Sequence, residues 1–131
     1  MSPHPPKNVA GVGVDWISWK RLERFLSDHT PEFLKRLLSP SEQRAFQRSR
    51  FSLRYFGRCF AAKEAYFKAA ELGGMGEEVF REFEARILGR GRFHIAAVKK
   101  SGFTIPPAEG RFFESPEGIG AALVLYPGGR P

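Results

Sequence analysis

Cysteine and long apolar runs are scarce in this sequence. One of its 131 residues is a cysteine, Cys59, so no internal disulfide can form, which suits a reducing compartment. The longest apolar run covers residues 119–126, far short of the ~20 residues that cross a bilayer. The first residues carry no hydrophobic segment of the signal-peptide type. These absences predict a soluble, cytoplasmic protein with no membrane partner.

Familiar metal and phosphate motifs are also missing. The sequence holds no CxxC pair, no HExxH, no calcium-loop pattern and no GxxxxGK[ST] loop. Its three histidines, His4, His29 and His94, are scattered, so a zinc site is not expected. Oxygen ligands alone would suit magnesium, which keeps several waters and binds one or two carboxylates together with a substrate phosphate.

Positive charge is what the sequence has in excess. Lys and Arg number 21 against 14 Asp and Glu, which gives a net charge of +7 and a pI of about 10.0. Nucleic acid, a membrane surface, a nucleotide-like substrate or an acidic protein would each satisfy such a surface. A basic protein with no specific anionic partner is also compatible with these totals. The turn GRGRF at residues 89–93 is by itself weak evidence for RNA binding.

Apolar residues recur at helical spacing through the first part of the chain, after a strand candidate at residues 8–14. Serine, proline and glycine mark where the helices start and stop. Helices are therefore expected just past Asp15, from Pro31, from a Ser39–Glu42 capping box to about Arg48, and over residues 52–72 with a stop at Gly73 and Gly74.

The rest of the chain reads as strands separated by glycine and proline turns. The expected strands are residues 82–89, 92–98, 110–113 and 119–126. Helices followed by strands predict an α+β fold, with an antiparallel sheet packed against one long and several short helices. We expect a single domain over residues 8–127, with flexible tails at residues 1–7 and 128–131.

Asp15 follows the glycines of GVG, where the expected strand gives way to a helix. Glycines at such a place let another backbone or a phosphate approach closely. The aspartate has two interpretations: it caps the helix that follows, or it belongs to a site.

Glu64 is the second acidic residue of interest. Helical spacing puts it beside Phe60, Ala61 and Phe67, at the edge of the buried stripe of the longest helix. A carboxylate in that position needs a cation nearby. Lys68, one turn further on, offers a simple salt bridge, and a metal ion shared with another carboxylate is the alternative.

Three segments, in order, resemble one family. Residues 11–25, GVGVDWISWKRLERF, resemble the first signature of the holo-acyl-carrier-protein synthases, the small 4'-phosphopantetheinyl transferases: a strand ending G-[IV]-G-x-D, then a helix with K-R-[IL]-E. Residues 60–70, FAAKEAYFKAA, resemble the second signature, R-F-[AS]-x-K-E-A-x-x-K-A. RLLSPSEQRAF, residues 36–46, resembles the element between them. The resemblance is close from Val9 to Ala70 and looser beyond.

The resemblance implies an enzyme that moves the phosphopantetheine arm of coenzyme A onto a serine of an apo acyl carrier protein and releases adenosine 3',5'-bisphosphate. It implies Mg²⁺ as cofactor, with Asp15 and Glu64 as metal ligands and catalytic residues. Lys63 and Arg58 would bind coenzyme A. Lys68 would contact it too, and would support the attacking serine or the charge on the transferred phosphoryl group.

The resemblance also implies partners. Carrier proteins present an acidic helix, which suits the net charge of +7. Arg21 would face the carrier protein with Lys20 and Arg24 beside it, and Lys35 and Arg36 are further candidates for that surface, although each is about as compatible with a solvated helix face. Relatives of this size are typically homotrimers with the nucleotide site between subunits, and a homotrimer that binds no nucleic acid is expected. Fatty acid or polyketide biosynthesis is the implied setting.

The sequence departs from the family pattern in three places. Cys59 stands where the family has arginine, with Arg58 one step earlier, about 100° away around a helix. Residues 71–78 replace a G-T-G-[IV]-G loop, and Ser115 lies near a [ST]-H pair but no histidine follows. These departures predict weaker coenzyme A binding. A catalytically impaired member that binds coenzyme A or a carrier protein is the alternative, and a basic nucleic-acid-binding domain is the third hypothesis.

Overall fold

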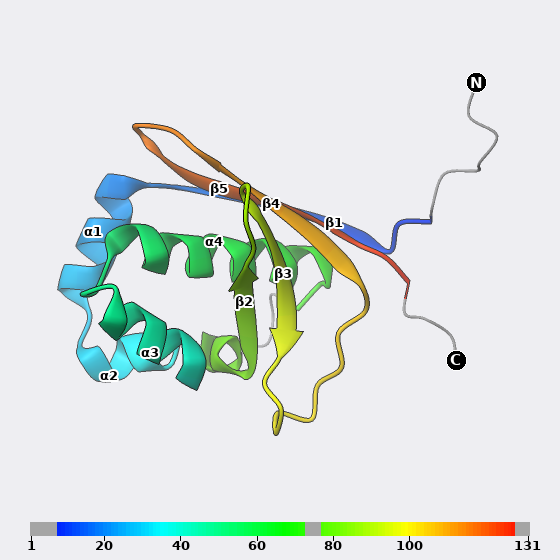
Figure 1. Ribbon diagram of the computed structural model, residues 1–131, viewed down its shortest axis with the longest axis horizontal. Coiled ribbons are helices and arrows are strands. Elements are labelled where there is room, and N and C mark those ends of the chain that lie inside the picture. The colour runs from blue at the N-terminus through cyan, green and yellow to red at the C-terminus, as the bar shows by residue number, and fades with distance from the viewer. Residues whose placement is uncertain (1–7, 73–76, 128–131) are drawn as a thin grey trace.

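The computed structural model describes residues 8–72 and 77–127. It is an α+β structure, as predicted, with one sheet and one long helix (Figure 1). In chain order the elements are β1 (Gly11–Ser18), α1 (Trp19–Asp28), α2 (Pro31–Lys35), α3 (Pro40–Arg48), α4 (Leu53–Ala69), the 3-10 helix η1 (Glu77–Glu82), β2 (Phe83–Ile87), β3 (Arg92–Ala97), β4 (Ala108–Glu114) and β5 (Gly118–Leu125).

The sheet is antiparallel throughout, with strand order β1-β5-β4-β3-β2. The first and last strands pair along their whole length, from Gly11 opposite Leu125 to Ser18 opposite Gly118. β3 and β4, by contrast, pair at only two positions before they diverge. The sheet is therefore most continuous where β1, β5 and β4 lie side by side.

The first strand is longer than the sequence predicted. Asp15 lies inside β1, opposite Ala121, and not at the start of a helix. Ser18 is the N-cap of α1, and its Oγ accepts a hydrogen bond from the Arg21 N–H at 3.1 Å. The prediction of a helix just past Asp15 is therefore wrong, and so is its interpretation as a helix cap. Pairing with β5 keeps the backbone extended until Ser18 supplies the cap.

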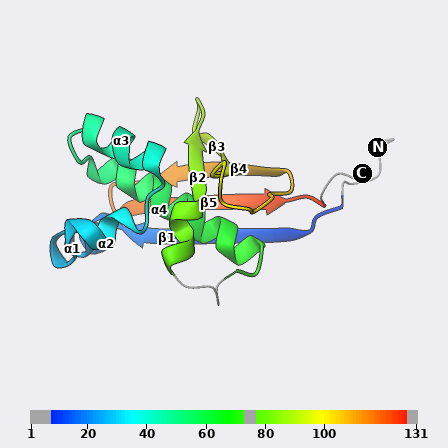
Figure 2. The same cartoon turned by 90° about the horizontal axis from the view of Figure 1, so that it is seen from below.

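Helix α4 lies against one face of the sheet, alongside β1 and β5, while α1, α2 and α3 gather at one end of the molecule (Figures 1 and 2). Small residues make this close packing possible: Ala61, Ala65 and Ala69 are all buried on α4. No helix among the described residues covers the opposite face of the sheet (Figure 1). The sheet thus has one buried and one open face.

Phenylalanines fill the space between α4 and the smaller elements. Phe56 is fully buried, with ring centroids 6.0 Å from Phe25 and 5.8 Å from Phe46. Further along α4, Phe67 meets Phe80 edge-on at 4.7 Å. Most rings of this phenylalanine-rich chain therefore serve the core, and each contributes both apolar area and ring-ring contact.

Other sequence predictions are confirmed. α2 begins at Pro31, the Ser39–Glu42 capping box is complete, and α3 ends at Arg48. The predicted strands appear within a few residues of their expected ends. The helix stop at residues 73–74 and the tails at residues 1–7 and 128–131 lie outside the described residues. Within the described ranges, no helix is long and apolar enough to span a membrane.

Candidate active site

Two glycines bring β1 into direct contact with the backbone of α4. A β-carbon at Gly13 would lie 1.8 Å from the carbonyl oxygen of Ala65, and one at Gly11 would lie 2.1 Å from that of Ala69. Any larger residue would push the strand away from the helix. The glycines of GVG therefore accommodate another backbone, one of the two roles open from the sequence, and they place Asp15 next to α4.

Asp15 and Lys68 meet across this contact. Lys68 Nζ donates hydrogen bonds to Asp15 Oδ1 at 3.0 Å and to the Val14 carbonyl at 3.1 Å. The Asp15 side chain is 13% exposed, whereas that of Lys68 is 53% exposed. The strand carboxylate is therefore held in place while the ammonium remains open to a substrate.

Glu64 belongs to the same corner of the molecule. It lies one helical turn before Lys68, and it directly precedes Ala65, whose carbonyl meets Gly13. Its side chain is partly buried, as expected from the edge of the apolar stripe. Asp15, Glu64 and Lys68 form what we call the β1–α4 corner, which combines two carboxylates with one accessible ammonium.

The donor set of the β1–α4 corner fits magnesium. Asp15 Oδ1 is engaged by Lys68, while Oδ2 has no hydrogen-bond partner among the described residues. Within the same residues, no group of three or more His, Cys, Asp or Glu side chains could hold a metal. Two carboxylates, with the remaining positions left to water and substrate phosphate, are what magnesium accepts.

Lys63, the other lysine of the motif, lies in the core. Its side chain is 0% exposed, and Nζ donates to the Leu37 carbonyl at 2.8 Å, to the Phe80 carbonyl at 3.0 Å and to Glu42 Oε1. Three acceptors use all three protons of an ammonium group. The prediction that Lys63 contacts a phosphate is therefore contradicted by this structure, because the group is saturated and enclosed.

Glu42 completes this buried cluster. One carboxylate oxygen accepts from the Ser39 N–H at 2.9 Å as well as from Lys63, and the other accepts from the Ala85 N–H at 2.7 Å. We call Glu42 and Lys63 the buried ion pair; it ties α3, α4 and β2 together. The sequence did contain a signal for it, since Lys63 is seven residues after Phe56 and thus on the same helix face.

Arg58 lies away from the β1–α4 corner. It donates to Glu114 at 2.7 Å, beside Arg54, and its guanidinium lies 5.5 Å from the centre of the Phe112 ring. Burial alone would raise the pKa of Glu114, but hydrogen bonds from Arg54 and Arg58 outweigh it and leave that pKa below its ordinary value. Arg58 is thus anchored to β4, six residues and about 240° of helix rotation before Glu64.

The departures from the family pattern have structural explanations. Cys59 is fully buried, and burial raises the pKa of its thiol well above the ordinary value, with Glu42 adding to the effect. Position 59, where the family pattern has arginine, is therefore a core position in this chain. Ser115 Oγ accepts from the backbone N–H groups of Glu117 and Gly118, so it closes the turn between β4 and β5.

The predicted partner residues are accessible. Lys20, Arg21 and Arg24 are all exposed on α1, whose buried residue is Leu22. These three cations therefore remain available to an acidic surface.

Comparisons with known sequences agree with this geometry. The sequence model of the 4'-phosphopantetheinyl transferase superfamily matches residues 11–111. A holo-[acyl-carrier-protein] synthase of Halorhodospira halophila is 36% identical over 97 residues, which cover 71% of this chain and 77% of that protein. The one from Ruthia magnifica is 45% identical over 65 residues, which span about half of each chain, 50% and 51%.

Solved structures show the same fold. The holo-[acyl-carrier-protein] synthase of Neisseria meningitidis superposes with a TM-score of 0.77 at 24% identity, covering 92% of this chain and 100% of that one. A Bacillus anthracis holo-(acyl-carrier-protein) synthase in complex with CoA (3',5'-ADP) gives a TM-score of 0.68 at 31% identity over 89% and 96% of the two chains. The chain therefore belongs to the holo-acyl-carrier-protein synthase family and is a phosphopantetheinyl transferase.

Proposed function

We propose that this protein transfers the phosphopantetheine arm of coenzyme A to a serine of an apo acyl carrier protein in a magnesium-dependent reaction. The observation that carries the proposal is the β1–α4 corner, where Lys68 is hydrogen-bonded to Asp15 and Glu64 lies one turn away. Family membership supplies the reaction class. The named relatives are holo-acyl-carrier-protein synthases, and one was solved with coenzyme A.

The proposed step is a phosphoryl transfer. The serine oxygen bonds to the phosphorus next to the pantetheine, the bond from that phosphorus to the bridging oxygen breaks, and adenosine 3',5'-bisphosphate leaves. Lys68, with its exposed ammonium, stabilises charge on the transferring group. The serine proton passes to a carboxylate of the β1–α4 corner or to a water molecule held beside it.

Asp15 and Glu64 are the residues that would hold Mg²⁺. An ion held there would offset part of the negative charge of the two carboxylates and the pyrophosphate, and it would polarise the phosphoryl oxygens. Asp15 is prepared for this role because Lys68 fixes one of its oxygens and leaves the other open. Arg58 remains our candidate for a further phosphate contact, in competition with Glu114.

The carrier protein would dock on α1. Lys20, Arg21 and Arg24 are exposed there, and they belong to the helix that directly follows the strand of Asp15. Basic side chains at the rim of a complex chiefly raise the rate of encounter with an acidic partner. Charge reversal at Arg21 should therefore lower kcat/KM for the carrier protein and leave the KM for coenzyme A unchanged.

We also propose that copies of this chain associate through the open face of the sheet, as a homotrimer. Val12 is 61% exposed there, Val14 52% and Trp16 50%, on alternate positions of β1, and Phe113, 45% exposed, covers Gly120 on the same face. A continuous apolar patch on a protein surface marks an interaction site. Trp16→Lys should shift the mass in solution toward the monomer, as measured by light scattering.

The cytoplasm is the compartment that we propose. Because the single cysteine is free and buried, the protein needs no disulfide and suits a reducing compartment. The described helices include none that could span a membrane.

A mass measurement tests the proposed reaction. Apo carrier protein incubated with enzyme, coenzyme A and Mg²⁺ should gain the mass of one phosphopantetheine arm. Asp15→Ala and Glu64→Ala should abolish this gain while the proteins stay folded, and Glu117→Ala, at an exposed turn, serves as the control. Coenzyme A binding without any mass gain, across several carrier proteins, would instead select a catalytically impaired family member.

A further inference from the structure

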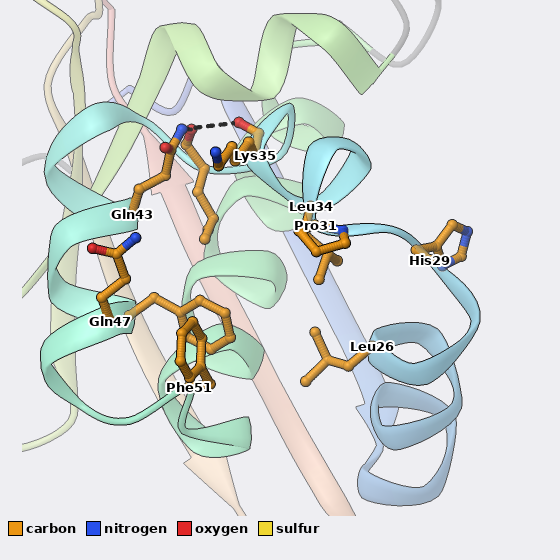
Figure 3. A pocket seen from close by; sticks show the side chains of 10 residues that line it. Leu26, His29, Pro31, Leu34, Lys35, Gln43, Gln47 and Phe51 are labelled. Carbon is orange, nitrogen blue, oxygen red and sulfur yellow. Dashed lines mark hydrogen bonds between the residues drawn. The ribbon is translucent and has the colours of Figure 1, made fainter.

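A pocket of about 360 Å³ lies between α1, α2 and α3, and it shares no residue with the β1–α4 corner. This volume is within the range of pockets that hold small ligands, roughly 300–1,000 Å³. Figure 3 shows side chains from the three helices and from the segment after α3 directed toward one space. The lining residues are Leu26, His29, Pro31, Leu34, Lys35, Leu38, Gln43, Phe46, Gln47 and Phe51.

The pocket is apolar over most of its wall, and the described residues that line it include no acidic one. Its cationic group is Lys35, which lies at one end near Gln43, while Phe51 lies at the other end (Figure 3). The Lys35 ammonium has no partner among the described residues, and both Gln43 side-chain hydrogens are used by the carbonyls of Lys35 and Leu38. The pocket thus has a positive end and an apolar end.

The His29 ring does not contribute to the positive end of the pocket. Its ring lies 4.2 Å from that of Phe25 and 4.3 Å from that of Phe33, and Nδ1 is 2.7 Å from the Phe25 carbonyl. In Figure 3 the ring lies at the outer edge of the group. Among the described residues that line the pocket, Lys35 is therefore the one free cation.

Phe51 is a second, independent observation. Its side chain is 63% exposed, and its backbone has φ +61°, a left-handed conformation that a bulky residue adopts only under strain. Its ring meets that of Phe46 edge-on at 5.2 Å, which makes it a wall of the pocket. Exposure and strain are both unfavourable in the free protein, and residues kept in that state cluster at binding sites.

We propose that this pocket binds a single-chain anionic amphiphile of the fatty-carboxylate type. The chain would lie against Leu26, Phe46 and Phe51, and the carboxylate would pair with Lys35. The pocket and this ligand match in charge and in shape. The unpaired Lys35 ammonium suits one anionic head group, and the apolar rest of the pocket suits one hydrocarbon chain. An acidic protein helix would require several cations around the rim, and the described lining residues offer one.

Titration of the full-length protein with dodecanoate, below its micelle concentration, tests the proposal. We expect saturable heat, together with NMR shifts confined to the amides of α1, α2, α3 and the segment after α3. Lys35→Gln should weaken binding about tenfold, because it removes a charge-assisted contact. Lys99→Gln, at an exposed lysine outside the pocket, is the matched control.

Phe51→Asn separates binding from folding. Asparagine tolerates the left-handed conformation, so this variant should unfold at the same or a higher denaturant concentration than the parent. It should still lose about tenfold in affinity, since the apolar wall is gone. Leu88→Asn removes an exposed apolar side chain elsewhere and should leave the affinity for dodecanoate unchanged.

The proposal would be overturned by any of three results. One is the absence of saturable binding below the micelle concentration. Another is equal binding of dodecyltrimethylammonium, which would show that Lys35 selects nothing. The third is binding only to anionic vesicles or to an acidic amphipathic peptide, which would assign the face to a membrane or to a protein.

Discussion

Two lysines five residues apart on α4 occupy opposite environments. Lys63 is 0% exposed and is held by the buried ion pair, whereas Lys68 is 53% exposed and is hydrogen-bonded to Asp15 at the β1–α4 corner. Both belong to the same short motif, FAAKEAYFKAA, so the motif alone does not separate their roles. Their position around the helix does: Lys63 shares a face with Phe56, and Lys68 turns toward β1.

The difference indicates that the two lysines of α4 have different roles, one in folding and one in the reaction. In the buried ion pair, Lys63 Nζ donates all three of its hydrogens to protein acceptors, so it has none left for a ligand. The β1–α4 corner keeps one carboxylate oxygen and an ammonium accessible. Substitution of the first lysine should therefore affect folding, and substitution of the second should affect chemistry.

The largest expected effect is that of Lys63→Met on stability. It leaves Glu42 as an unpaired buried carboxylate, and such a loss destabilises a protein by about 3–5 kcal/mol. Urea denaturation followed by circular dichroism would measure it. The double variant Lys63→Met with Glu42→Leu should recover part of the loss, because no charge is left buried. A single variant as stable as the parent would contradict the assignment of Lys63 to the core.

Lys68→Met should show the reverse behaviour. Its hydrogen bond to Asp15 lies at the surface, so the free energy of unfolding should change by less than about 1 kcal/mol. Transfer to a carrier protein should fall about 10²–10³-fold in kcat, as expected when a group that stabilises transition-state charge is lost. Lys100→Met, at an exposed lysine in a turn, is the control for charge. Unchanged kcat in the Lys68 variant would remove this residue from the mechanism.

Local features of the fold could be predicted from the sequence. The Ser39–Glu42 capping box and the long helix depend on neighbours within a few residues, and both were found. The extent of β1 was missed because pairing with β5 joins residues more than a hundred positions apart, such as Asp15 and Ala121. No local pattern carries that information.

For the candidate site, the sequence predicted several of the residues but not how they come together. Asp15 and Lys68 were both named, but their approach depends on the contact of Gly13 with the α4 backbone, which spacing along the chain does not reveal. The family resemblance, carried over by position, implies a phosphate contact for Lys63. Its helical position relative to Phe56 pointed to the core, and this physical signal was the better guide.

Gly13→Ala should disturb the β1–α4 corner and leave the buried ion pair intact. Its β-carbon would meet the Ala65 carbonyl at 1.8 Å, so β1 must move away from α4. Such overpacking should cost about 1–3 kcal/mol of stability, and transfer activity should fall more than that loss of folded protein explains. The buried ion pair lies on another face of α4 and should be undisturbed, as amide exchange of Ala85 would show. Val9→Ala, at an exposed position before β1, is the control.

The smallest expected effect concerns a third cluster, Arg54, Arg58 and Glu114, whose Arg58–Glu114 pair lies between the two lysines in exposure. The pKa of Glu114 is lowered in the folded protein, so its ion pairs stabilise the fold above the ordinary pKa of 4.5. That contribution should be lost as the pH falls through the lower folded value. Because the pairs are partly solvated, the contribution is small.

Glu114→Gln gives the measurement. Its destabilisation relative to the parent, from urea titrations between about pH 6 and about pH 3, should shrink toward zero at the acidic end. Glu117→Gln, whose side chain is exposed at the nearby turn, should show no such trend. A difference between Glu114→Gln and the parent that stays constant with pH would mean that the arginines do not hold the Glu114 carboxylate. Arg58 would then be free to reach a phosphate, and the contrast between a structural cluster and an open site would be lost at this position.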